Sequence, residues 1–255
     1  MAINLDQIKD RLKQIQQTAS SGGGSDFLWK PPVGKSQIRI VPYAFNKDNP
    51  FQELYFHFEV GKKTLLSPSS FGRPDPIIDF SDKLKRTGNK DDWKLGRKIE
   101  PKFRVYAPII IRGQEEEGVK FWSFGKQIYQ ELLGIISDPD YGDITDLMNG
   151  RDITIEHTPA EKDGAFPTFS VRVKPNTTPA TNDKDIAAKI VSNQKNISDI
   201  IKEPTFEELQ QALENWLNPE NVQTNTKGAS PAKNSNTAKV EDIQSAFDSL
   251  FDPKG

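Results

Sequence analysis

The feature that most constrains the fold is a series of short β-branched and aromatic segments that follow one another as hairpins. Phe103 to Ile111 is joined to Val119 to Phe124 by a loop with two glycines. Arg151 to His157 is joined to Phe166 to Lys174 through Lys162-Asp163-Gly164. Segments of this kind, bounded by turn residues, predict antiparallel strand pairs. A chain built from such pairs favours a small barrel over a parallel α/β sheet.

Two further segments extend this pattern toward the N-terminus. Ser36 to Pro42 is short and β-branched, and Glu53 to Val60 turns through Gly61-Lys62-Lys63 into Thr64 to Leu66. Between the later strand pairs, Gln127 to Ile136 places its apolar residues on one helical face. We therefore expect a β-rich α+β fold with a barrel core and helical additions.

The N-terminal residues predict an amphipathic helix on a tether. Leu5, Ile8, Leu12 and Ile15 are spaced by three and four residues, which gives one apolar helical stripe. The run Ser20 to Ser25 contains three glycines and is typical of a flexible linker. A tethered helix has to dock its stripe on its own core or on another molecule, and self-association is one such role.

The C-terminal third changes character after Pro175. Asp183 to Ile201 and Thr205 to Leu217 predict helices, and Thr205 begins a capping box with Glu208. Residues 218–239 are rich in Asn, Thr, Ser, Pro, Gly and Lys, which predicts a disordered linker. Residues 240–255 carry acids and an apolar stripe that includes Phe247, Leu250 and Phe251. This stripe is typical of a tail that docks in an aromatic-lined or basic groove.

Composition excludes several classes of function. The chain has no Cys and two His, so thiol catalysis and cysteine zinc sites have no residues to use. No segment approaches the roughly 20 apolar residues of a membrane helix, and the N-terminus lacks a signal-peptide core. No set of carboxylates stands out as an acid–base pair. We expect a cytoplasmic protein that is not an enzyme and does not contact a membrane.

The strongest functional pattern is the mixing of basic and aromatic residues along the strands. One stretch of the chain is rich in Lys and Arg, from Lys83 to Arg104, and favours a polyanion partner. Alternate residues of a strand share a face, so Arg172 can point with Lys174, and Trp122 with Lys120. Cations that follow phosphates and rings that stack on bases are what unpaired nucleic acid requires. A half-buried barrel with charges outside and aromatics inside would give the same pattern.

An ordered set of segments resembles a known family. The segments are Gln37 to Pro42, Tyr106 to Ile111, Lys120 to Tyr129 and Phe169 to Lys174, and the most specific piece is Phe124-Gly125-Lys126 before a helix. Together they resemble the single-stranded-DNA-binding protein of T-even-type tailed bacteriophages. The resemblance implies an OB-fold core that binds the strand, an N-terminal segment for cooperative self-association, and an acidic tail for replication and recombination proteins.

Carried over onto this sequence, the resemblance places Arg39 near the binding cleft and Tyr106 and Trp122 among the cleft aromatics, and Lys126 follows on the same signature as Trp122. The family usually holds zinc through one His and three Cys. His57 resembles the histidine, but Ser67, Ile77 and Phe80 stand approximately where the thiolates would be. The family zinc site is therefore expected to be lost, so we expect no metal and no cofactor. The N-terminus also lacks the family's basic cluster.

These observations give one set of expectations. The expected domains are an N-terminal helix (1–19), a linker (20–26), an OB-fold core that binds single-stranded DNA (27–180), a helical extension (181–217), a disordered linker (218–239) and an acidic tail (240–255). The expected function is binding of single-stranded DNA without sequence specificity in phage replication, recombination and repair, in the host cytoplasm. Two alternatives stay open, a phage structural or scaffold protein and an RNA-binding translational regulator.

The candidate residues fall into two groups. The DNA-contacting set contains the basic and aromatic residues named above and their neighbours in the basic stretch: Arg39, Lys83, Lys85, Arg86, Lys98, Lys102, Arg104, Tyr106, Lys120, Trp122, Lys126, Arg172 and Lys174. The protein-interaction set contains the two apolar stripes: Leu5, Ile8, Leu12, Ile15, Phe247, Leu250 and Phe251.

Overall fold

The computed structural model describes residues 25–61, 63–162 and 165–218 of the 255-residue chain. The expected N-terminal helix, the acidic tail and almost all of the linker before that tail lie outside these described residues. The two apolar stripes proposed for protein interactions therefore lie outside them as well.

The described residues contain eight strands and six α-helices, so the fold is β-rich α+β. The strands are β1 Leu28–Trp29, β2 Gly34–Ile40, β3 Gln52–His57, β4 Leu65–Leu66, β5 Lys102–Ile111, β6 Lys120–Phe124, β7 Arg151–Thr158 and β8 Thr168–Thr177. The helices are α2 Pro76–Arg86, α3 Lys90–Ile99, α4 Lys126–Ile136, α5 Lys184–Ser192, α6 Ile197–Ile200 and α7 Phe206–Leu217. Short 3-10 helices occur at Ser25–Phe27, Pro68–Phe71 and Glu115–Glu117.

None of the helices among the described residues is both long enough and apolar enough to cross a membrane.

Two compact units interleave along the sequence. Among the described residues, unit 1 comprises those from residue 25 to Glu53 together with those between Arg104 and Ile201. Unit 2 comprises the described residues between Leu54 and Phe103 together with those from Lys202 to residue 218. The first part of unit 2 thus lies in the sequence between the two parts of unit 1, and its second part follows them, an organisation that a linear division of the chain does not anticipate.

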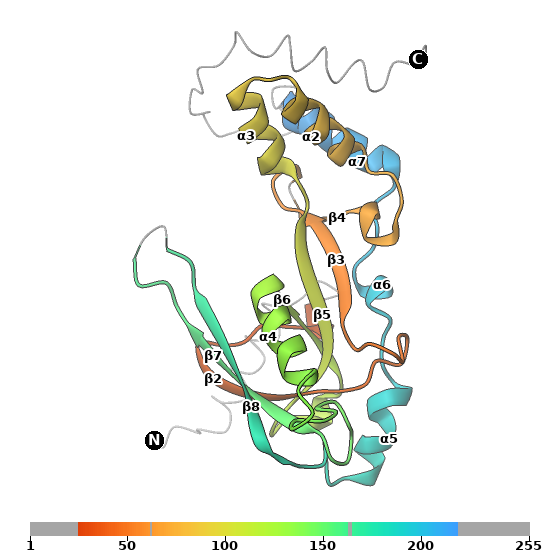
Figure 1. The fold of residues 1–255 in the computed structure, drawn as a ribbon. Coiled ribbons are helices and arrows are strands. Elements are labelled where there is room, and N and C mark those ends of the chain that lie inside the picture. The colour runs from red at the N-terminus through yellow and green to blue at the C-terminus, as the bar shows by residue number, and fades with distance from the viewer. Residues whose placement is uncertain (1–24, 62, 163–164, 219–255) are drawn as a thin grey trace, which may run out of the picture. The chain divides into compact units, whose positions relative to one another are not determined.

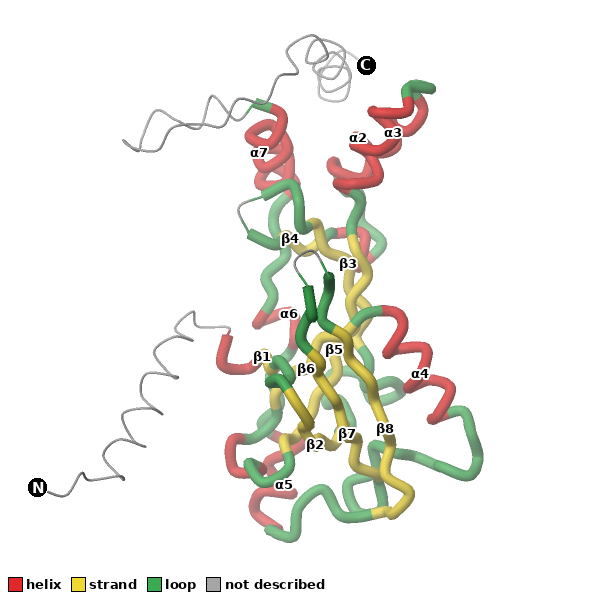
Figure 2. Tube along the Cα trace, turned by 90° about the vertical axis from the view of Figure 1, so that its left-hand side faces the viewer, coloured by secondary structure: helices red, strands yellow, loops and turns green. Residues whose placement is uncertain are grey.

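Unit 1 is built on a mixed sheet with the strand order β1-β6-β5-β2-β7-β8 (Figure 2). β1 pairs with β6 in parallel, while β5–β6, β2–β5, β2–β7 and β7–β8 are antiparallel. The hairpins predicted from the sequence as β5–β6 and β7–β8 are confirmed, and so is the predicted turn from β3 into β4 outside this strand order. Among the described residues no pairing joins β1 to β8, the two ends of this order, so closure into an OB-fold barrel stays a prediction.

The pleat of the unit 1 strands separates a core face from an outer face. On β8, Val171 and Val173 are buried, whereas Arg172 and Lys174 are exposed. The core face includes Ile38 and Ile40 of β2, Ile153 and Ile155 of β7, and Val105, Ala107 and Ile109 of β5. Helix α4 buries Ile128, Tyr129 and Leu132 and packs on β8. The predicted helix over 127–136 is confirmed by α4.

Unit 2 has its own apolar core. Helices α2 and α3 pack together, and α7 adds Leu209 and Leu213 although it lies more than 100 residues later in the chain (Figure 1). Ile77, Phe80, Leu84 and Ile99 complete this core together with Val60. A Cβ atom on Gly96 would lie 2.8 Å from the carbonyl oxygen of Ser81. Glycine at this position therefore lets α3 approach the backbone of α2.

Helix boundaries agree with the sequence in α4 and α7 and differ elsewhere. Thr205 and Glu208 form the predicted capping box at the start of α7. The single helix predicted over 183–201 is wrong, because the chain breaks between α5 and α6. At this break the side chain of Gln194 bonds to the carbonyl of Pro42 and the N–H of Ala44, at 2.7 and 2.8 Å. Helices α2 and α3 were not predicted.

Candidate nucleic-acid interface

The outer face of β5 and β6 carries an aromatic residue beside cations. In the register of this pair, Tyr106 lies opposite Ser123 and Ala107 lies opposite Trp122. Residues directly opposite in an antiparallel pair share a face, and the face changes at each step along the strand. Tyr106 and Ser123 therefore point outward, whereas Ala107 and Trp122 point into the core.

Tyr106 lies in a partly buried, cation-flanked position. Burial raises the pKa of its phenol above the usual value, although the hydrogen bond with Ser123 and the charge of Arg104 act to lower it. Arg104 is exposed and lies two residues before Tyr106 on the same face. One of its guanidinium nitrogens would be 3.0 Å from a Cβ on Gly125, so glycine leaves room for it. Lys126, the first residue of α4, is exposed next to this glycine.

Trp122 does not take part in this surface. Its side chain is 1% exposed, and its ring lies 4.4 Å from that of Phe124 and 6.5 Å from that of Trp29. The expectation that Trp122 stacks on bases is wrong for this structure, because the ring fills the core of unit 1. Lys120 shares that face at the end of the strand, where its ammonium pairs with Glu117.

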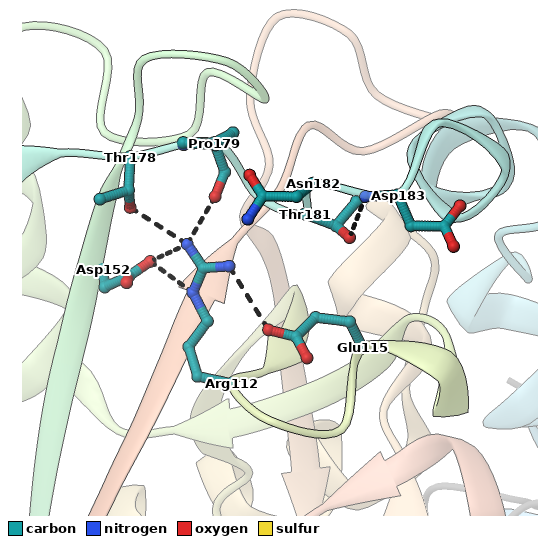
Figure 3. Close-up of a pocket in the computed structure, with 8 residues that line it drawn as sticks. All are labelled: Arg112, Glu115, Asp152, Thr178, Pro179, Thr181, Asn182 and Asp183. Atoms are coloured by element: carbon teal, nitrogen blue, oxygen red, sulfur yellow. Dashed lines mark hydrogen bonds and ion pairs between the residues drawn. The ribbon is translucent and has the colours of Figure 1, made fainter.

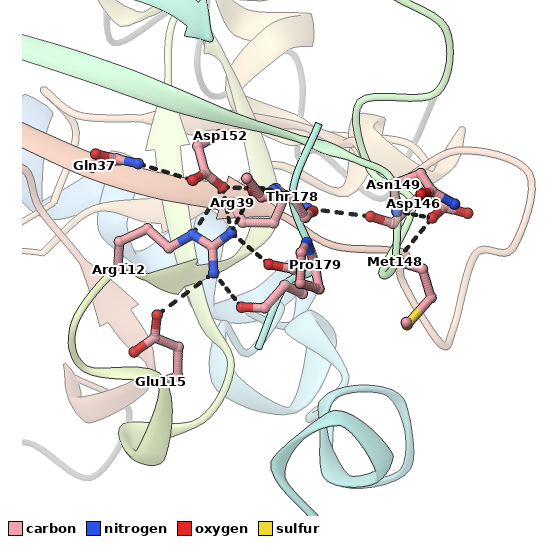
Figure 4. A network of polar contacts seen from close by, with 11 residues as sticks. Gln37, Arg39, Arg112, Glu115, Asp146, Met148, Asn149, Asp152, Thr178 and Pro179 are labelled. Carbon is pink, nitrogen blue, oxygen red and sulfur yellow. Dashed lines mark hydrogen bonds and ion pairs between the residues drawn. The ribbon is translucent and has the colours of Figure 1, made fainter. Parts of the chain in front are cut away.

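Arg39 is likewise a buried structural residue. Its side chain is fully buried, and its Nε and Nη2 atoms donate to Asp152 Oδ1 at 3.0 and 2.7 Å (Figure 4). Nη1 and Nη2 also donate to the carbonyl and hydroxyl oxygens of Thr178, at 2.9 and 2.7 Å. The expectation that Arg39 contacts DNA is wrong for this structure, because protein acceptors enclose its guanidinium group.

Arg112 binds the same carboxylate from the other side. Its Nε donates to Asp152 Oδ1 at 2.8 Å, and Nη2 reaches the carbonyl of Pro179 and the hydroxyl of Thr178 at 2.8 and 3.1 Å (Figure 3). Gln37 donates to the second oxygen of Asp152 at 2.8 Å. The carboxylate thus joins strands β2 and β7, and the two guanidinium groups that it binds hold the segment that follows β8.

A recess of about 550 Å³ opens beside this network (Figure 3). Its charged lining residues are Arg112, Glu115, Asp152 and Asp183, so acids outnumber bases. Arg112 is already bonded to Asp152 and Glu115. This balance makes the recess a poor site for a phosphate group.

The outer face of β8 supplies further cations in unit 1. Arg172 and Lys174 are both exposed, as the predicted alternation requires, and Ser170 precedes them on the same face. Thr154 of β7 lies opposite Arg172 in the register. These residues form a polar, basic strip on the last strand of the sheet.

The predicted cations of unit 2 differ in how closely protein acceptors bind them. Lys85 is bonded to Asp82 and Glu100 at 2.5 and 2.6 Å, and these carboxylates raise its pKa. Lys98 lies 3.6 Å from Glu59, and Lys102 donates to the carbonyl of Arg97 at 3.3 Å. Arg86 is exposed and Lys83 is half-buried.

A cationic and aromatic face on α3 was missed in the candidate set. Trp93 is 48% exposed, and the guanidinium of Arg97 lies 5.5 Å from the centre of its ring. Lys90 and Lys94 are exposed as well. These four residues have the spacing i, i+3, i+4 and i+7, which places them on one side of a helix. That spacing is visible in the sequence once residues 90–99 are recognised as a helix.

Comparison with known protein families gives a match over most of the chain. A family model described as gp32 DNA binding protein like matches residues 33–218, which is more than half of the chain. No curated protein matches the chain.

The Asp152 network predicts a dependence of stability on pH. Burial acts to raise the pKa of the Asp152 carboxyl, but the hydrogen bond from Arg112 and the charges of Arg39 and Arg112 lower it overall. Ionised Asp152 therefore stabilises unit 1 fully above the unfolded pKa of about 3.9, and this stabilisation is lost as pH falls through the lower folded value. The expected result is a melting temperature that falls in acid.

The variant Asp152→Asn tests this prediction. It leaves the buried charge of Arg39 without its carboxylate, so we expect a loss of about 3–5 kcal/mol at neutral pH. The difference from the wild type should narrow in acid, as followed by thermal melts between pH 7 and pH 3. Glu116→Gln, which changes an exposed carboxylate, is the control and should melt like the wild type at neutral pH. A gap that stays constant across this pH range would contradict the prediction.

Proposed function

Because the chain belongs to the gp32-like family of DNA-binding proteins, we propose that it binds single-stranded DNA without sequence specificity. The resemblance seen in the sequence agrees with this family. The observation that carries the proposal is the outer face of β5 and β6, where Tyr106 lies between Arg104 and Ser123. The family is one of DNA-binding proteins and not of enzymes.

The chemistry of this face suits a single strand. Arg104 and Lys126 can neutralise phosphates, and the ring of Tyr106 can stack on a base at roughly 1–3 kcal/mol per base. Arg172 and Lys174 add positive charge on β8. Stacking is tolerant of sequence because every base has a π-face, and phosphate contacts carry no sequence information.

The cationic face of α3 is a second proposed contact, in unit 2. Trp93 offers an exposed ring, while Lys90, Lys94 and Arg97 surround it with positive charge. The carboxylate of Asp91 lies 3.7 Å from Lys94, with both side chains 62% exposed. An exposed pair of this kind contributes little and can exchange for a phosphate.

The wider role remains part of the proposal. We infer that the protein acts in phage DNA replication, recombination and repair in the host cytoplasm. We also infer that its DNA-binding core is an OB-fold. Strand β2 lies between β5 and β7 in the sheet order, which supports a Greek-key barrel. Self-association is assigned to the N-terminal residues 1–19, and contacts with replication and recombination proteins to residues 240–255.

Deletion of residues 240–255 tests the role of the acidic tail. Capture of phage replication proteins by the tagged chain should be lost, because the tail supplies both the apolar stripe and the acids. Single-strand binding should persist, since the described cations lie in other segments. Continued capture by the shortened chain would refute this assignment.

The polymer preference separates the proposed function from its alternatives. We expect affinity for single-stranded DNA well above that for duplex DNA or RNA, measured by fluorescence anisotropy at several salt concentrations. Each phosphate neutralised should add about 0.7 to the magnitude of the log–log salt slope. Preference for RNA would favour a translational regulator. No binding to any nucleic acid would favour a structural or scaffold protein.

The double variant Arg172→Ala/Lys174→Ala isolates the β8 strip within the same experiment. If both cations contact phosphates, the slope should fall by about 1.4, which is two contacts at about 0.7 each. Lys184→Ala removes an exposed lysine of α5 and serves as the control, with a slope like that of the wild type. Equal slopes for the double variant and the control would remove β8 from the proposed surface.

Tyr106 tests the stacking part of the mechanism. Tyr106→Ala should weaken single-strand binding by roughly 1–3 kcal/mol, because it removes the stacking ring. Tyr106→Phe keeps the ring and should bind within a few-fold of the wild type. The measurement is anisotropy at fixed salt, with circular dichroism to verify folding. Normal binding by a folded Tyr106→Ala protein would exclude stacking at this position.

Intrinsic fluorescence distinguishes Trp93 from Trp122. Stacking on a base should quench the exposed Trp93, whereas Trp122 at 1% exposed cannot meet a base in the folded unit. Trp93→Phe should therefore remove most of the quenching caused by oligothymidylate. Trp122→Phe is the matched variant and should retain it. Retained quenching in the Trp93 variant would contradict a base contact on α3.

A further inference from the structure

A buried polar cluster lies beside the apolar core of unit 2. His57 of β3 is fully buried, and Asp75 and Ser67 are 3% and 0% exposed. The Nε2 atom of His57 lies 2.9 Å from Asp75 Oδ2, and Nδ1 lies 2.8 Å from the carbonyl oxygen of Ile99. The Ser67 hydroxyl donates to the same Asp75 oxygen.

The cluster connects four separated points of the chain. Asp75 is the N-cap of α2, where Oδ1 accepts from the N–H groups of Ile77 and Ile78 at 2.9 and 3.3 Å. Ser67 is the N-cap of the 3-10 helix Pro68–Phe71, and Ile99 is the last residue of α3. One imidazole and one carboxylate therefore connect β3, the segment after β4, the start of α2 and the end of α3.

The charge state follows from the hydrogen bonds. The carbonyl oxygen of Ile99 and an ionised Asp75 can only accept, so each ring nitrogen of His57 donates to the acceptor that it faces. Asp75 accepts from two backbone N–H groups and one hydroxyl, which favours the ionised carboxylate. Burial raises the pKa of Asp75, but its contacts with His57 and Ser67 lower it overall. The cluster is thus a buried ion pair whose hydrogen-bonding groups are satisfied.

The residues do not fit the metal that the family resemblance implies. Two of the three positions matched to thiolates hold Ile77 and Phe80, which have no donor atoms and are fully buried in the apolar core. The third holds Ser67, whose hydroxyl is bonded to Asp75. Within the described residues, no group of three or more His, Cys, Asp or Glu side chains could hold a metal. In the same residues no buried side-chain nitrogen or oxygen lacks a partner.

We propose that the His57–Asp75 ion pair, with Ser67, takes the place of a metal as the internal cross-link of unit 2. The cross-link joins segments that are up to 42 residues apart, from His57 to Ile99. A zinc site holds such segments through bonds from a metal to three or four side chains. Here the carboxylate of Asp75 and the imidazole of His57 hold the segments together, and the apolar side chains of Ile77 and Phe80 occupy two of the positions matched to thiolates.

The first arm of the test is metal dependence in the full-length chain. Protein produced in zinc-supplemented medium should contain far less than one zinc per chain by elemental analysis. Hydrogen exchange, measured by mass spectrometry on peptides from α2 and α3, should be the same before and after prolonged chelation. Stoichiometric zinc, or loss of protection on chelation, would overturn the proposal.

The second arm is a double-mutant cycle read on the same peptides. His57→Gln and Asp75→Asn should each speed exchange in α2 and α3 by on the order of 100-fold, because each breaks a buried ion pair. The fold-increase in exchange rate of the double variant should be much smaller than the product of the fold-increases of the two single variants, because the two residues act as one pair. Effects that simply multiply would refute the ion pair as a unit.

Ser81→Ala is the matched control, because its hydroxyl donates to the carbonyl of Gly96 in the same core at 2.9 Å, outside the cluster. In a double variant with His57→Gln, the fold-increase in exchange rate should equal the product of the two single fold-increases. If Asp75→Asn leaves no protection to measure, Ser67→Ala replaces it in the cycle, and the same coupling with His57→Gln is required. Absence of that coupling would also refute the proposal.

Discussion

The proposed binding surface depends on the register between β5 and β6. Opposite pairs alternate between the core and the outside, so Val105 with Phe124 and Ala107 with Trp122 are buried, while Tyr106 with Ser123 faces outward. A slip of one residue would exchange these faces and place Trp122 outside. The aromatic core and the outer, basic face are therefore two consequences of one pairing. Burial of the large Trp122 ring favours this register over its neighbours.

A second constraint decides which part of the outer face stays open. Arg39 lies on that face, opposite Ile110 in the register, and is nevertheless fully buried. The segment after β8 covers it, bonded through Thr178 and Pro179 to Arg39 and Arg112. Ala180 and Ile190 then pack on Ile110 and Val41. A shared carboxylate on two guanidinium groups holds this cover, so Arg39 is buried while Tyr106 stays partly exposed and the β8 cations stay exposed.

Local patterns in the sequence predicted the hairpins and the ends of two helices. Alternation placed Arg172 with Lys174, and the capping box fixed the start of α7. The same rule placed Lys120 with Trp122 but could not state which face is inside, since that depends on how β6 pairs with β5 and β1. Local sequence patterns also could not predict side-chain partners that are distant in the sequence, such as Arg39 and Asp152, which are 113 residues apart.

Helices α2 and α3 show how tertiary contacts turn a run of charges into a defined face. Leu95, Gly96 and Ile99 turn toward the core, which leaves Trp93 and its neighbouring cations on the outside of α3. Lys85 is withdrawn from this surface because Asp82 and Glu100 enclose its ammonium group. His57 binds the carbonyl of Ile99 at the end of α3 and, through Asp75, the start of α2. The buried His57–Asp75 pair thus holds the end of the helix that carries the α3 face, so a surface proposed to meet DNA is supported by polar contacts that lie out of reach of DNA.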